Sequence, residues 1–583
     1  MLRQIILSSL LAVIGLSAMA SAPKRIPLTM RQSDGTTIVV QRAGDEHGHY
    51  YLTSDGVAVM RDVRGRDLVY ATVKEGRLYP STIIAHEANA RTTAEITHIN
   101  TLRRDLQADL QPNVRRHATA ASTTDGLGKY GQRSGGVVNS IGKHIIPVIM
   151  VQFPDLKFME SSTMEKVSRI FNEDGYNDED GCKGSVRDYF LEQSNGMFDP
   201  TFEVVAIVTA SNGYKYYGGN DQWGEDKHPE ELTQEAVRLA EAQGVDFSKY
   251  VEGDAVPLVS IMHAGEGEHD SWDANSEDFI WAHFADYAPF TEDGIKFSSY
   301  FMGNERYKED SWREARPEGI GLFCHEFSHA LGLPDFYGTT QAALDNETPG
   351  WWSLMDYGEY WGNGFCPIGY SAYERSYMGW LDIKELGDTP EFVTLYPYYL
   401  SDEGNTAYVI RNPMNPNEYY ILESRQVDTF YPSNLGHGML VAHVDFRKSS
   451  WEKNTLNNAA DHMRYQIVRA DNQWQSPVRN SKSLWYGDLF PGYWKVTEFC
   501  DDTLLRTAKA FTGDGFDRPL YDITETSDGI ITFKYIDANI DGISSPVAAA
   551  TADATAYTLD GRKVDAAAAQ HGIYIVGGKK IVK

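Results

Sequence analysis

One short segment of this chain, residues 319–335, limits its fold and its chemistry more than any other. It reads Gly-Ile-Gly-Leu-Phe-Cys-His-Glu-Phe-Ser-His-Ala-Leu-Gly-Leu-Pro-Asp, and apolar residues recur at helical spacing from Ile320 to Leu331. Positions four residues apart lie on the same face of a helix, so the side chains of His325 and His329 converge. The segment therefore predicts a helix that presents two imidazoles to one point.

The pair of histidines predicts a zinc site. Two neutral imidazoles at this spacing can bind one Zn²⁺ with nitrogen–metal distances of about 2.0 to 2.1 Å. Glu326 projects beside them, where it can take a proton from a water molecule on the metal. Because zinc lowers the pKa of that water to about 7, a carboxylate is a sufficient base at neutral pH.

The end of this helix indicates a third ligand. Gly332 can adopt the left-handed conformation that ends a helix, and Pro334 prevents the helix from resuming. The chain then turns sharply, so Asp335 can swing back to the metal. Glu347 and Glu374 are alternatives, because some zinc sites take a later glutamate. We expect a solvated loop for Glu347, and a buried ion pair or a supporting role for Glu374.

A second string, residues 353–357 (Ser-Leu-Met-Asp-Tyr), follows downstream. With the extended His-Glu-x-x-His-x-x-Gly-x-x-Asp motif, it resembles the metzincin metalloproteases, which carry a methionine-containing turn beneath the metal. The resemblance implies that Met355 is the hydrophobic floor of the zinc site and that Tyr357 hydrogen-bonds the oxyanion of the tetrahedral intermediate. It also favours Asp335 over the later glutamates. Without the zinc motif, core packing would be the simpler role for Met355 and Tyr357.

Further strings narrow the resemblance to the immune-inhibitor-A-like family of secreted bacterial zinc metalloproteases. They lie at 184–190, 194–196, 263–268, 280–281, 329–337, 350–355, 373–375 and 378–381, so the similarity extends over residues 144–470. The resemblance implies a catalytic α/β domain with an attached β-rich module and one catalytic Zn²⁺. Family members often carry Ca²⁺ as well, so calcium is a further expected cofactor, with no ligands assigned.

The pattern of apolar residues predicts a mixed α+β protein of several domains, as expected for a chain of 583 residues. Buried strands are predicted at 145–153 and 256–262, and helices at 186–193 and 230–242. From about residue 390 strand and turn patterns predominate, as in a β-sandwich. We therefore expect a metzincin-like α/β catalytic domain at 141–389, a β-sandwich-like accessory domain at 390–543, a linker at 544–556 and a sorting-like tail at 557–583.

The N-terminal part has the pattern of a leader followed by a pro-region. Residues 1–20 combine an early positive charge, an apolar run and the small-x-small site Ala18-Met19-Ala20, which is typical of a signal peptide. Residues 21–140 are expected to form a small β-rich propeptide, with a charged helical stretch at 102–110 and a Gly/Ser/Thr/Ala-rich linker at 118–136. This arrangement is typical of a zymogen with a cleavage site at Arg115-Arg116, and an ordinary extra domain is the alternative.

We expect the N-terminal unit to inhibit the enzyme until it is removed. The first cysteine of the chain is Cys182, which excludes a propeptide thiol on the zinc. A carboxylate such as Asp45, an imidazole such as His47 or His49, and simple occlusion of the active site remain open. Occlusion is the preferred interpretation.

The C-terminal residues 557–583 form two strand patterns with a basic end. They resemble the sorting tails of proteins exported by the bacterial type IX secretion system, which implies recognition by secretion machinery and delivery to the surface or the medium. The alternative is a small hairpin that ends the fold. Four cysteines are too few for a disulfide framework, so a Cys324–Cys366 bridge and buried free thiols are both open.

The net charge excludes several kinds of partner. At −29, with no Lys/Arg-rich patch, the chain would be repelled by nucleic acid and by anionic membrane surfaces. No apolar run reaches the ~20 residues needed to span a bilayer, which argues against membrane insertion. Protein or peptide substrates are the expected partners of a protein found outside the cell or at its surface.

The expected function is that of a secreted zinc metalloendopeptidase. Zinc would polarise the scissile carbonyl, Glu326 would deprotonate the bound water and then protonate the leaving amine, and Tyr357 would support the oxyanion. A surface binding or adhesion protein on a protease-like scaffold is a first alternative, against which the retention of Glu326 argues. A zinc hydrolase of a non-peptide bond is a second, because fold and metal do not fix the substrate.

Overall fold

The computed structural model describes residues 17–540 and four strands within 555–582. Inside the first range it leaves out residues 46–47, 75–76, 109–123, 180, 222–223, 341–342, 344–345, 433–434, 474–481, 500–507 and 514–517. Most of the expected signal peptide, His47, the Arg115-Arg116 site and most of the expected linker at 544–556 therefore lie outside the described residues. No helix in the described part of the chain is long and apolar enough to cross a membrane.

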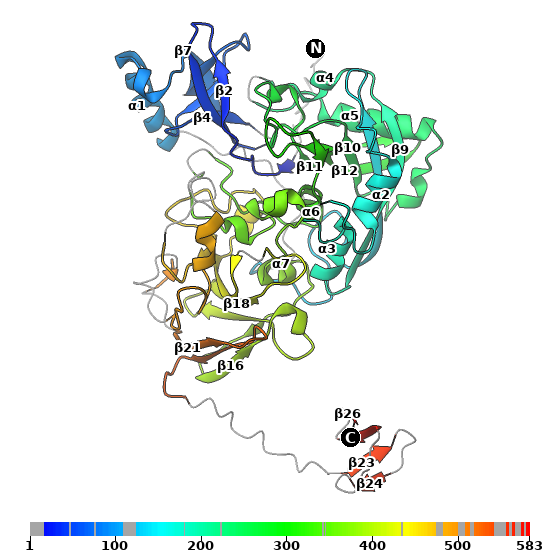
Figure 1. Ribbon diagram of the computed structural model, residues 1–583, viewed down its shortest axis with the longest axis vertical. Coiled ribbons are helices and arrows are strands. Elements are labelled where there is room, and N and C mark those ends of the chain that lie inside the picture. The colour runs from blue at the N-terminus through cyan, green and yellow to red at the C-terminus, as the bar shows by residue number, and fades with distance from the viewer. Residues whose placement is uncertain are drawn as a thin grey trace, which may run out of the picture.

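A six-stranded mixed sheet forms the centre of the central unit, residues 142–383, and its strand order is β1-β11-β12-β10-β8-β9 (Figure 1). The strands that run parallel are β8 (Gly142–Gln152), β9 (Phe198–Thr209), β10 (Val259–His263) and β12 (Ile295–Asn304). At the edge, β11 (His283–Glu292) runs antiparallel to β12, and β1 (Ser17–Ala20) runs antiparallel to β11. The start of the described chain is thus an edge strand of a sheet formed by much later residues.

Helices cover both faces of this sheet. One face is covered by α2 (Met164–Asn172), α3 (Val186–Gln193) and α6 (Ile320–Ala330), and the other by α4 (Tyr214–Gly218) and α5 (Pro229–Ala242). Along β8, Val148 and Met150 face the first core, whereas Ile149 and Val151 face the second. Because both faces are buried, this strand is a continuous apolar run in the sequence.

Capping residues, prolines and glycines in the sequence begin and end these helices close to the predicted bounds. A capping box at Ser185 begins α3, and a proline in the first turn begins α5. Helix α6 ends at Ala330, and Gly332 has a φ of 109°, which a residue with a Cβ rarely adopts. The left-handed residue predicted after the zinc-motif helix is therefore present.

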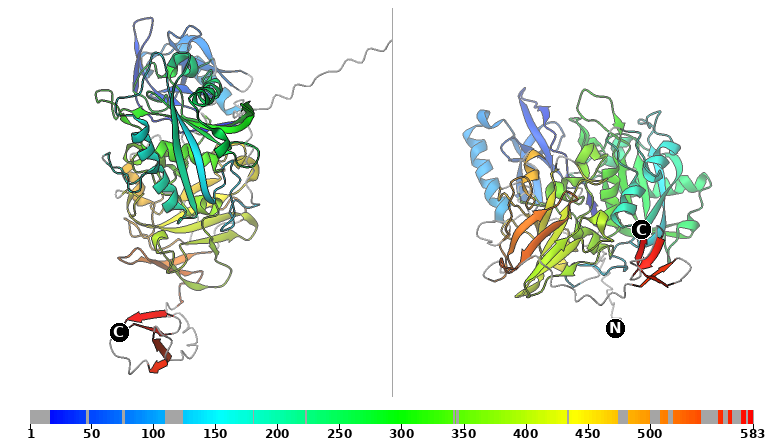
Figure 2. Two further views of the ribbon diagram at one scale, coloured as in Figure 1. Left: turned by 90° about the vertical axis from the view of Figure 1, so that its right-hand side faces the viewer. Right: turned by 60° about the horizontal axis from the view of Figure 1, so that its bottom comes forward.

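The N-terminal unit, residues 26–108, is a six-stranded antiparallel meander in sequence order. Its strands are β2 (Leu28–Arg31), β3 (Thr37–Ala43), β4 (Tyr50–Thr53), β5 (Ala58–Arg61), β6 (Leu68–Lys74) and β7 (Arg77–Ile84). Helix α1 (Thr93–Ala108) lies beside this sheet (Figure 2). It begins well before the expected stretch at 102–110, because Thr92 and Glu95 cap its first turn reciprocally.

The expectation of a free linker at 118–136 is wrong for residues 124–136, which pack on the central unit. Ser134 is 3% exposed and donates its hydroxyl to the carbonyl of Leu331 at the end of α6. A Cβ on Gly136 would lie 2.2 Å from the carbonyl carbon of Leu331. The composition of the segment did not reveal this contact. Glycine lets two backbones approach closely and serine donates a hydrogen bond, so the segment packs without apolar side chains.

The β-rich unit, residues 384–540, contains two sheets. The first has β15 (Lys384–Glu385), β17 (Ala407–Asn412), β18 (Asn415–Arg425), β19 (Gly438–Asp445) and β20 (Tyr465–Val468), and the second has β16 (Glu391–Leu395), β22 (Ile531–Tyr535) and β21 (Leu520–Glu525). Tyr420 and Leu422 of β18 face the core between the sheets, whereas Tyr419 and Ile421 face the core of the central unit. The sandwich therefore shares a core with the central unit, and β15 belongs to it although it precedes residue 390.

The remaining strands and α-helices of the described residues are short. They are β13 (Arg306–Tyr307), β14 (Arg316–Pro317), α7 (Ala372–Tyr377), α8 (Lys448–Trp451), and a C-terminal antiparallel sheet of β23 (Thr555–Thr558), β24 (Lys563–Asp565), β25 (Ile573–Val576) and β26 (Lys579–Val582). Strand β23 thus includes the last two residues of the expected linker. Cys182, Cys324 and Cys366 are buried free thiols, so Cys324 and Cys366 are not bridged.

Candidate metal centre

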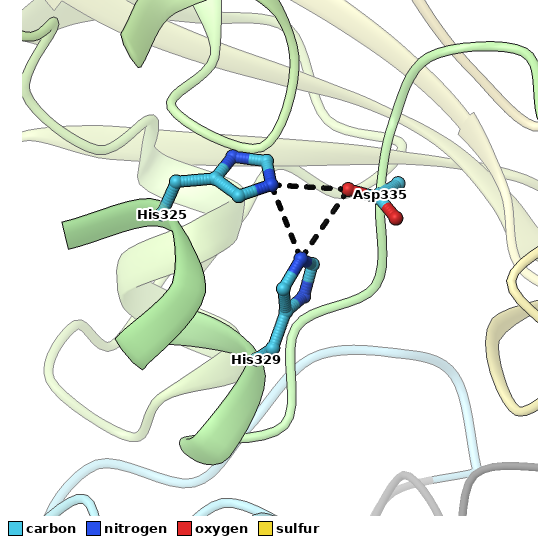
Figure 3. Close-up of side chains that lie close together, drawn as sticks. All are labelled: His325, His329 and Asp335. Atoms are coloured by element: carbon cyan, nitrogen blue, oxygen red, sulfur yellow. Dashed lines mark hydrogen bonds and ion pairs between the residues drawn. The ribbon is translucent and has the colours of Figure 1, made fainter. Parts of the chain in front are cut away.

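Helix α6 brings the two histidines of the motif together with Asp335 (Figure 3). The Nε2 atoms of His325 and His329 lie 3.1 Å apart. The Oδ1 atom of Asp335 lies 3.2 Å from the first Nε2 atom and 3.4 Å from the second. All three side chains are buried, because α6 packs between the central sheet and the 3₁₀ segment η6 (Tyr357–Gly364).

The spacing of these three atoms fits a tetrahedral metal ion. Ligand atoms that lie 2.0 to 2.1 Å from a tetrahedral zinc are separated from one another by about 3.3 Å. The three observed separations, 3.1, 3.2 and 3.4 Å, bracket this value. Apart from the two imidazoles, the Oδ1 atom of Asp335 has no partner among the described residues. Two imidazoles and one carboxylate leave a fourth position open, as in catalytic rather than structural zinc sites.

Backbone carbonyls fix the tautomer of both histidines. The Nδ1 atom of His325 lies 2.8 Å from the carbonyl oxygen of Leu354, and the Nδ1 atom of His329 lies 2.8 Å from that of Leu333. A carbonyl oxygen can only accept, so each Nδ1 carries the hydrogen and donates it. In the neutral rings the lone pair is then on Nε2, where both rings face Asp335.

A pair of hydrogen bonds from the β-rich unit holds Asp335, and sequence reasoning missed it. The side-chain amide of Asn454 donates to the Oδ2 atom of Asp335 at 2.6 Å, and its oxygen accepts from the backbone N–H of Asp335 at 2.8 Å. Asn457 donates to the carbonyl of the next residue, Phe336, at 2.7 Å. The third candidate ligand is therefore positioned by a segment 119 residues away, and no local pattern could have revealed it.

The two alternative glutamates, Glu374 and Glu347, have partners outside the cluster. Glu374 accepts hydrogen bonds from the hydroxyl of Ser353 and from the backbone of Ser371, where it completes the capping box of α7. Glu347 lies 3.8 Å from the guanidinium of Arg469. Neither belongs to the cluster of His325, His329 and Asp335, so the structure favours the local geometry that predicted Asp335.

The turn at 353–357 contacts both the first histidine of the cluster and the loop that carries Asp335. Leu354 contributes the carbonyl that holds His325, and the carbonyl of Met355 accepts from the backbone N–H of Phe336 at 2.7 Å. The turn thus joins the first histidine to the loop that carries Asp335. Met355 is fully buried, and its role as the floor of a zinc site stays a prediction.

Glu326 lies on α6 beside the cluster and accepts hydrogen bonds from Ser21. Its Oε1 atom lies 2.9 Å from the backbone nitrogen of Ser21 and 3.1 Å from the hydroxyl. Its Oε2 atom is buried and has no hydrogen-bond partner in the part of the chain that the structure describes. The Ser21 hydroxyl also lies 2.9 Å from Oε2 of Glu359. Glu359, a second buried carboxylate at this site, was missed, because one acid two residues after Tyr357 gives no distinctive signal.

Residues 21–24 lie across the site and are held mainly through their backbone. The carbonyls of Ser21, Ala22 and Pro23 accept from the side chains of Trp281, Tyr360 and Tyr357, respectively, and the N–H of Lys24 donates to the carbonyl of His269. Upstream, β1 pairs with the edge strand β11. Residues 21–24 follow directly on β1, and Ser21 contacts Glu326.

The electrostatics of the cluster favour a cation. Burial alone would lower the pKa of His325, but the surrounding carboxylates, Glu359 foremost, raise it to about 10. Burial lowers the pKa of His329, whereas the two imidazoles outweigh burial and hold the pKa of Asp335 below its usual range. Burial raises the pKa of Glu326 and raises that of Glu359 to about 7. A divalent ion would displace the proton that these carboxylates draw onto His325, so metal binding should weaken as the pH falls.

Neither Asp45 nor His49 of the N-terminal unit belongs to the cluster. His49 instead lies 2.9 Å from Glu268 and stacks on Trp281 of the central unit. Among the described residues, Ser21, which precedes the first strand of the N-terminal unit, contacts the two carboxylates beside the cluster, Glu326 and Glu359.

Comparisons with known proteins agree with this geometry. Residues 145–382 match the model of the immune inhibitor A peptidase M6 catalytic domain. Immune inhibitor A of Bacillus thuringiensis subsp. alesti is 25% identical over 335 residues, which are 48% of this chain and 48% of that protein. The pre-pro-metalloprotease PrtV of Vibrio cholerae serotype O1 (strain M66-2) is 24% identical over 295 residues, 42% of this chain and 32% of that protein.

The chain thus spans half or less of the length of these relatives. The matched segment begins in β8 and ends after α7, so it contains the whole cluster of His325, His329 and Asp335. Residues 145–382 therefore form a catalytic domain of the immune inhibitor A peptidase M6 family.

Proposed function

We propose that this chain is a zinc-dependent endopeptidase that acts on protein or peptide substrates outside the cell or at its surface. The observation that carries the proposal is the cluster of His325, His329 and Asp335, whose ligand atoms have the separations of a tetrahedral zinc site. The membership of residues 145–382 in a peptidase family supports hydrolysis of a peptide bond. Calcium stays an additional candidate, with no residues assigned.

The roles of the residues follow from their partners. His325, His329 and Asp335 would hold the zinc, which when bound supplies polarisation of the scissile carbonyl and a water of lowered pKa. Glu326 would act as general base, since its Oε2 atom is buried and no residue that the structure describes hydrogen-bonds to it. Its Oε1 atom lies 2.9 Å from the backbone nitrogen of Ser21, which is close enough for a protonated Glu326 to donate its proton to a leaving amine at that place.

Tyr357 is proposed to hydrogen-bond the oxyanion, but it needs to change partner to do so. Its hydroxyl lies 3.4 Å from the carbonyl oxygen of Pro23 and 3.4 Å from the Arg25 side chain. The peptide bond next to Glu326 is the one between Ala20 and Ser21, so the hydroxyl is engaged further along the segment. Release of the N-terminal segment would free Tyr357 for a substrate.

The decisive experiment is digestion of casein by the activated protein, with and without a zinc chelator. Cleavage that the chelator abolishes and added zinc restores supports the proposal. A folded, zinc-loaded protein that cleaves no peptide bond would refute it and favour a binding protein on a protease-like scaffold. Cleavage of ester or amide model compounds alone would favour a hydrolase of another bond.

We further infer that the N-terminal unit keeps the enzyme latent by occlusion. Ser21 contacts Glu326 through its backbone nitrogen and its hydroxyl, and the carbonyl of Ser21 accepts from Trp281. If a leader is removed after Ala20, Ser21 becomes the first residue and its amine lies beside Glu326. Full-length protein kept uncut should be much less active than the same protein after proteolytic removal of this unit. Equal activity would refute the inference.

Export and sorting are proposed from the sequence alone. The leader at 1–20 and the tail at 557–583 predict processing at both ends. Mass spectrometry of the protein recovered from the medium and from the cell surface tests both. A product that retains residues 1–20 would contradict the leader, and one whose delivery is unchanged without 557–583 would contradict the sorting role.

A further inference from the structure

Lys24 is the one long side chain of the segment 21–24; this side chain is 20% exposed, and its ammonium group lies against the central unit. The Nζ atom lies 3.3 Å from Oδ2 of Asp270. It also lies 4.9 Å from the ring centre of Tyr307 and 4.8 Å from that of Tyr360, within the range of cation–π attraction. Arg25, the next residue, donates to the carbonyl of Arg42, and its Nε atom also lies 3.4 Å from the hydroxyl of Tyr357. The ammonium group of Lys24, by comparison, contacts a buried carboxylate and two rings of the central unit.

The pocket around Lys24 needs a cation. Asp270 is 1% exposed, and its Oδ1 atom has no hydrogen-bond partner among the described residues. His269, 3.9 Å away, does not compensate its charge, because burial lowers the pKa of His269 to about 4 and keeps the ring neutral. Glu318 is a second buried carboxylate close by, and burial together with the charge of Asp270 raises its pKa to about 8. A buried carboxylate left without a cation is costly, so loss of Lys24 would leave the pocket ready for another basic group.

The segment that carries Lys24 is held by backbone contacts beside Glu326, as a bound substrate would be. The backbone groups that hold residues 21–24 are present in every polypeptide, and they contact Trp281, Tyr360, Tyr357 and His269. Glu326, the proposed proton donor to the leaving amine, contacts the backbone nitrogen of Ser21. In a bound substrate, the residue in the place of Ser21 would then be the first after the cleaved bond. The residue in the place of Lys24 would be the fourth.

We propose that Asp270, Tyr307 and Tyr360, with Glu318 beside them, form a substrate subsite for a lysine or arginine side chain on the fourth residue after the cleaved bond. This inference rests on the proposed peptidase function and adds a specificity to it. Lys24 occupies the same subsite in the latent protein, so the contact that selects substrates also holds the N-terminal segment.

The test uses the protein activated from the full-length chain and a peptide library made from a denatured proteome. Mass spectrometry of the products locates every cut. Lysine and arginine should be enriched at the fourth residue after the cut bond. Paired synthetic peptides that differ only by lysine or glutamine at that position should differ about tenfold in kcat/KM, as expected for a charge-assisted contact.

Two variants identify the pocket. Asp270→Asn keeps the shape of the side chain and removes its charge, and it should reduce the ratio between the paired peptides to nearly one. Asp254→Asn, at an exposed aspartate that pairs with Lys296, should keep the ratio. If Asp270→Asn fails to fold, the library cut by the unmodified enzyme still decides the position.

The outcomes separate this inference from the proposed function. Cuts without basic residues at the fourth position would overturn the subsite and leave the peptidase intact. A preference that survives in Asp270→Asn would overturn the assignment to this pocket. No cut at all by activated, zinc-loaded protein would overturn the peptidase function itself, and the subsite with it.

Discussion

Removal of the Asn454 side chain should weaken zinc binding although Asn454 is not a ligand. Its amide donates to the carboxylate of Asp335 at 2.6 Å and its oxygen accepts from the backbone of the same residue at 2.8 Å. Hydrogen bonds to a charged group contribute about 1.5 to 3 kcal/mol and neutral ones about 0.5 to 1.5 kcal/mol. Loss of residues that orient a metal ligand typically lowers metal affinity by about 10- to 100-fold, which is about 1.4 to 2.7 kcal/mol. We expect a decrease in this range.

The choice of variant matters, because Asn454 has a φ of 51°. Alanine in this left-handed conformation would add backbone strain, whereas glycine adopts it freely, so Asn454→Gly removes the side chain alone. Asn458→Gly is the matched control. Asn458 lies on the same segment and hydrogen-bonds Thr339 instead of Asp335.

The assay is competition for zinc between the full-length protein and a fluorescent chelator, with thermal unfolding in excess chelator as a measure of folding. Asn454→Gly should lose its zinc at a chelator concentration about 10- to 100-fold lower than the unmodified protein needs. Asn458→Gly should lose its zinc at the same concentration as the unmodified protein. Equal zinc affinity of Asn454→Gly and the unmodified protein would show that Asn454 does not position Asp335 for the metal.

Three further predictions concern neighbouring residues. Glu326→Gln should keep its zinc and its fold but lose activity by a factor of about 10² to 10⁴, and equal turnover would contradict its role as base. Glu374→Gln should unfold at lower temperature, since the change weakens the α7 cap and the contact with Ser353. Elemental analysis should still find a full complement of zinc in this variant. Loss of zinc would identify Glu374 as a ligand. The charge of Glu268 outweighs burial and raises the pKa of His49, so this ion pair should hold the N-terminal unit on the central unit below pH ~6.5 and weaken as the pH rises through the raised pKa. An added protease should therefore cleave the uncut protein faster at alkaline pH. His49→Gln should remove this dependence on pH.

The metal cluster could be predicted because its signals are local. The spacing of His325 and His329 and the end of the helix at Gly332 depend on residues a few positions apart, and helical geometry converts them directly into positions in space. The buried strand β8 was recognisable for a similar reason, since both of its faces are apolar. Asp335 was favoured over Glu374 on the same local grounds.

What could not be predicted depends on distant contacts. Asn454 lies 119 residues from Asp335, and Ser21 lies 305 residues from Glu326, so no periodicity relates them. Residues 124–136 have the composition of a linker, but they pack through backbone groups that composition does not describe. The start of α1 is different, because the Thr92-x-x-Glu95 cap was readable in the sequence.

We propose that His325, His329 and Asp335 hold one zinc ion. X-ray absorption at the zinc edge, combined with elemental analysis, tests this on the full-length protein and on folded Asp335→Ala. We expect one zinc per chain, bound by two imidazole nitrogens and a carboxylate oxygen at about 2.0 to 2.2 Å, and loss of most of the zinc in the variant. Sulfur in the coordination sphere, or full zinc content in Asp335→Ala, would contradict it.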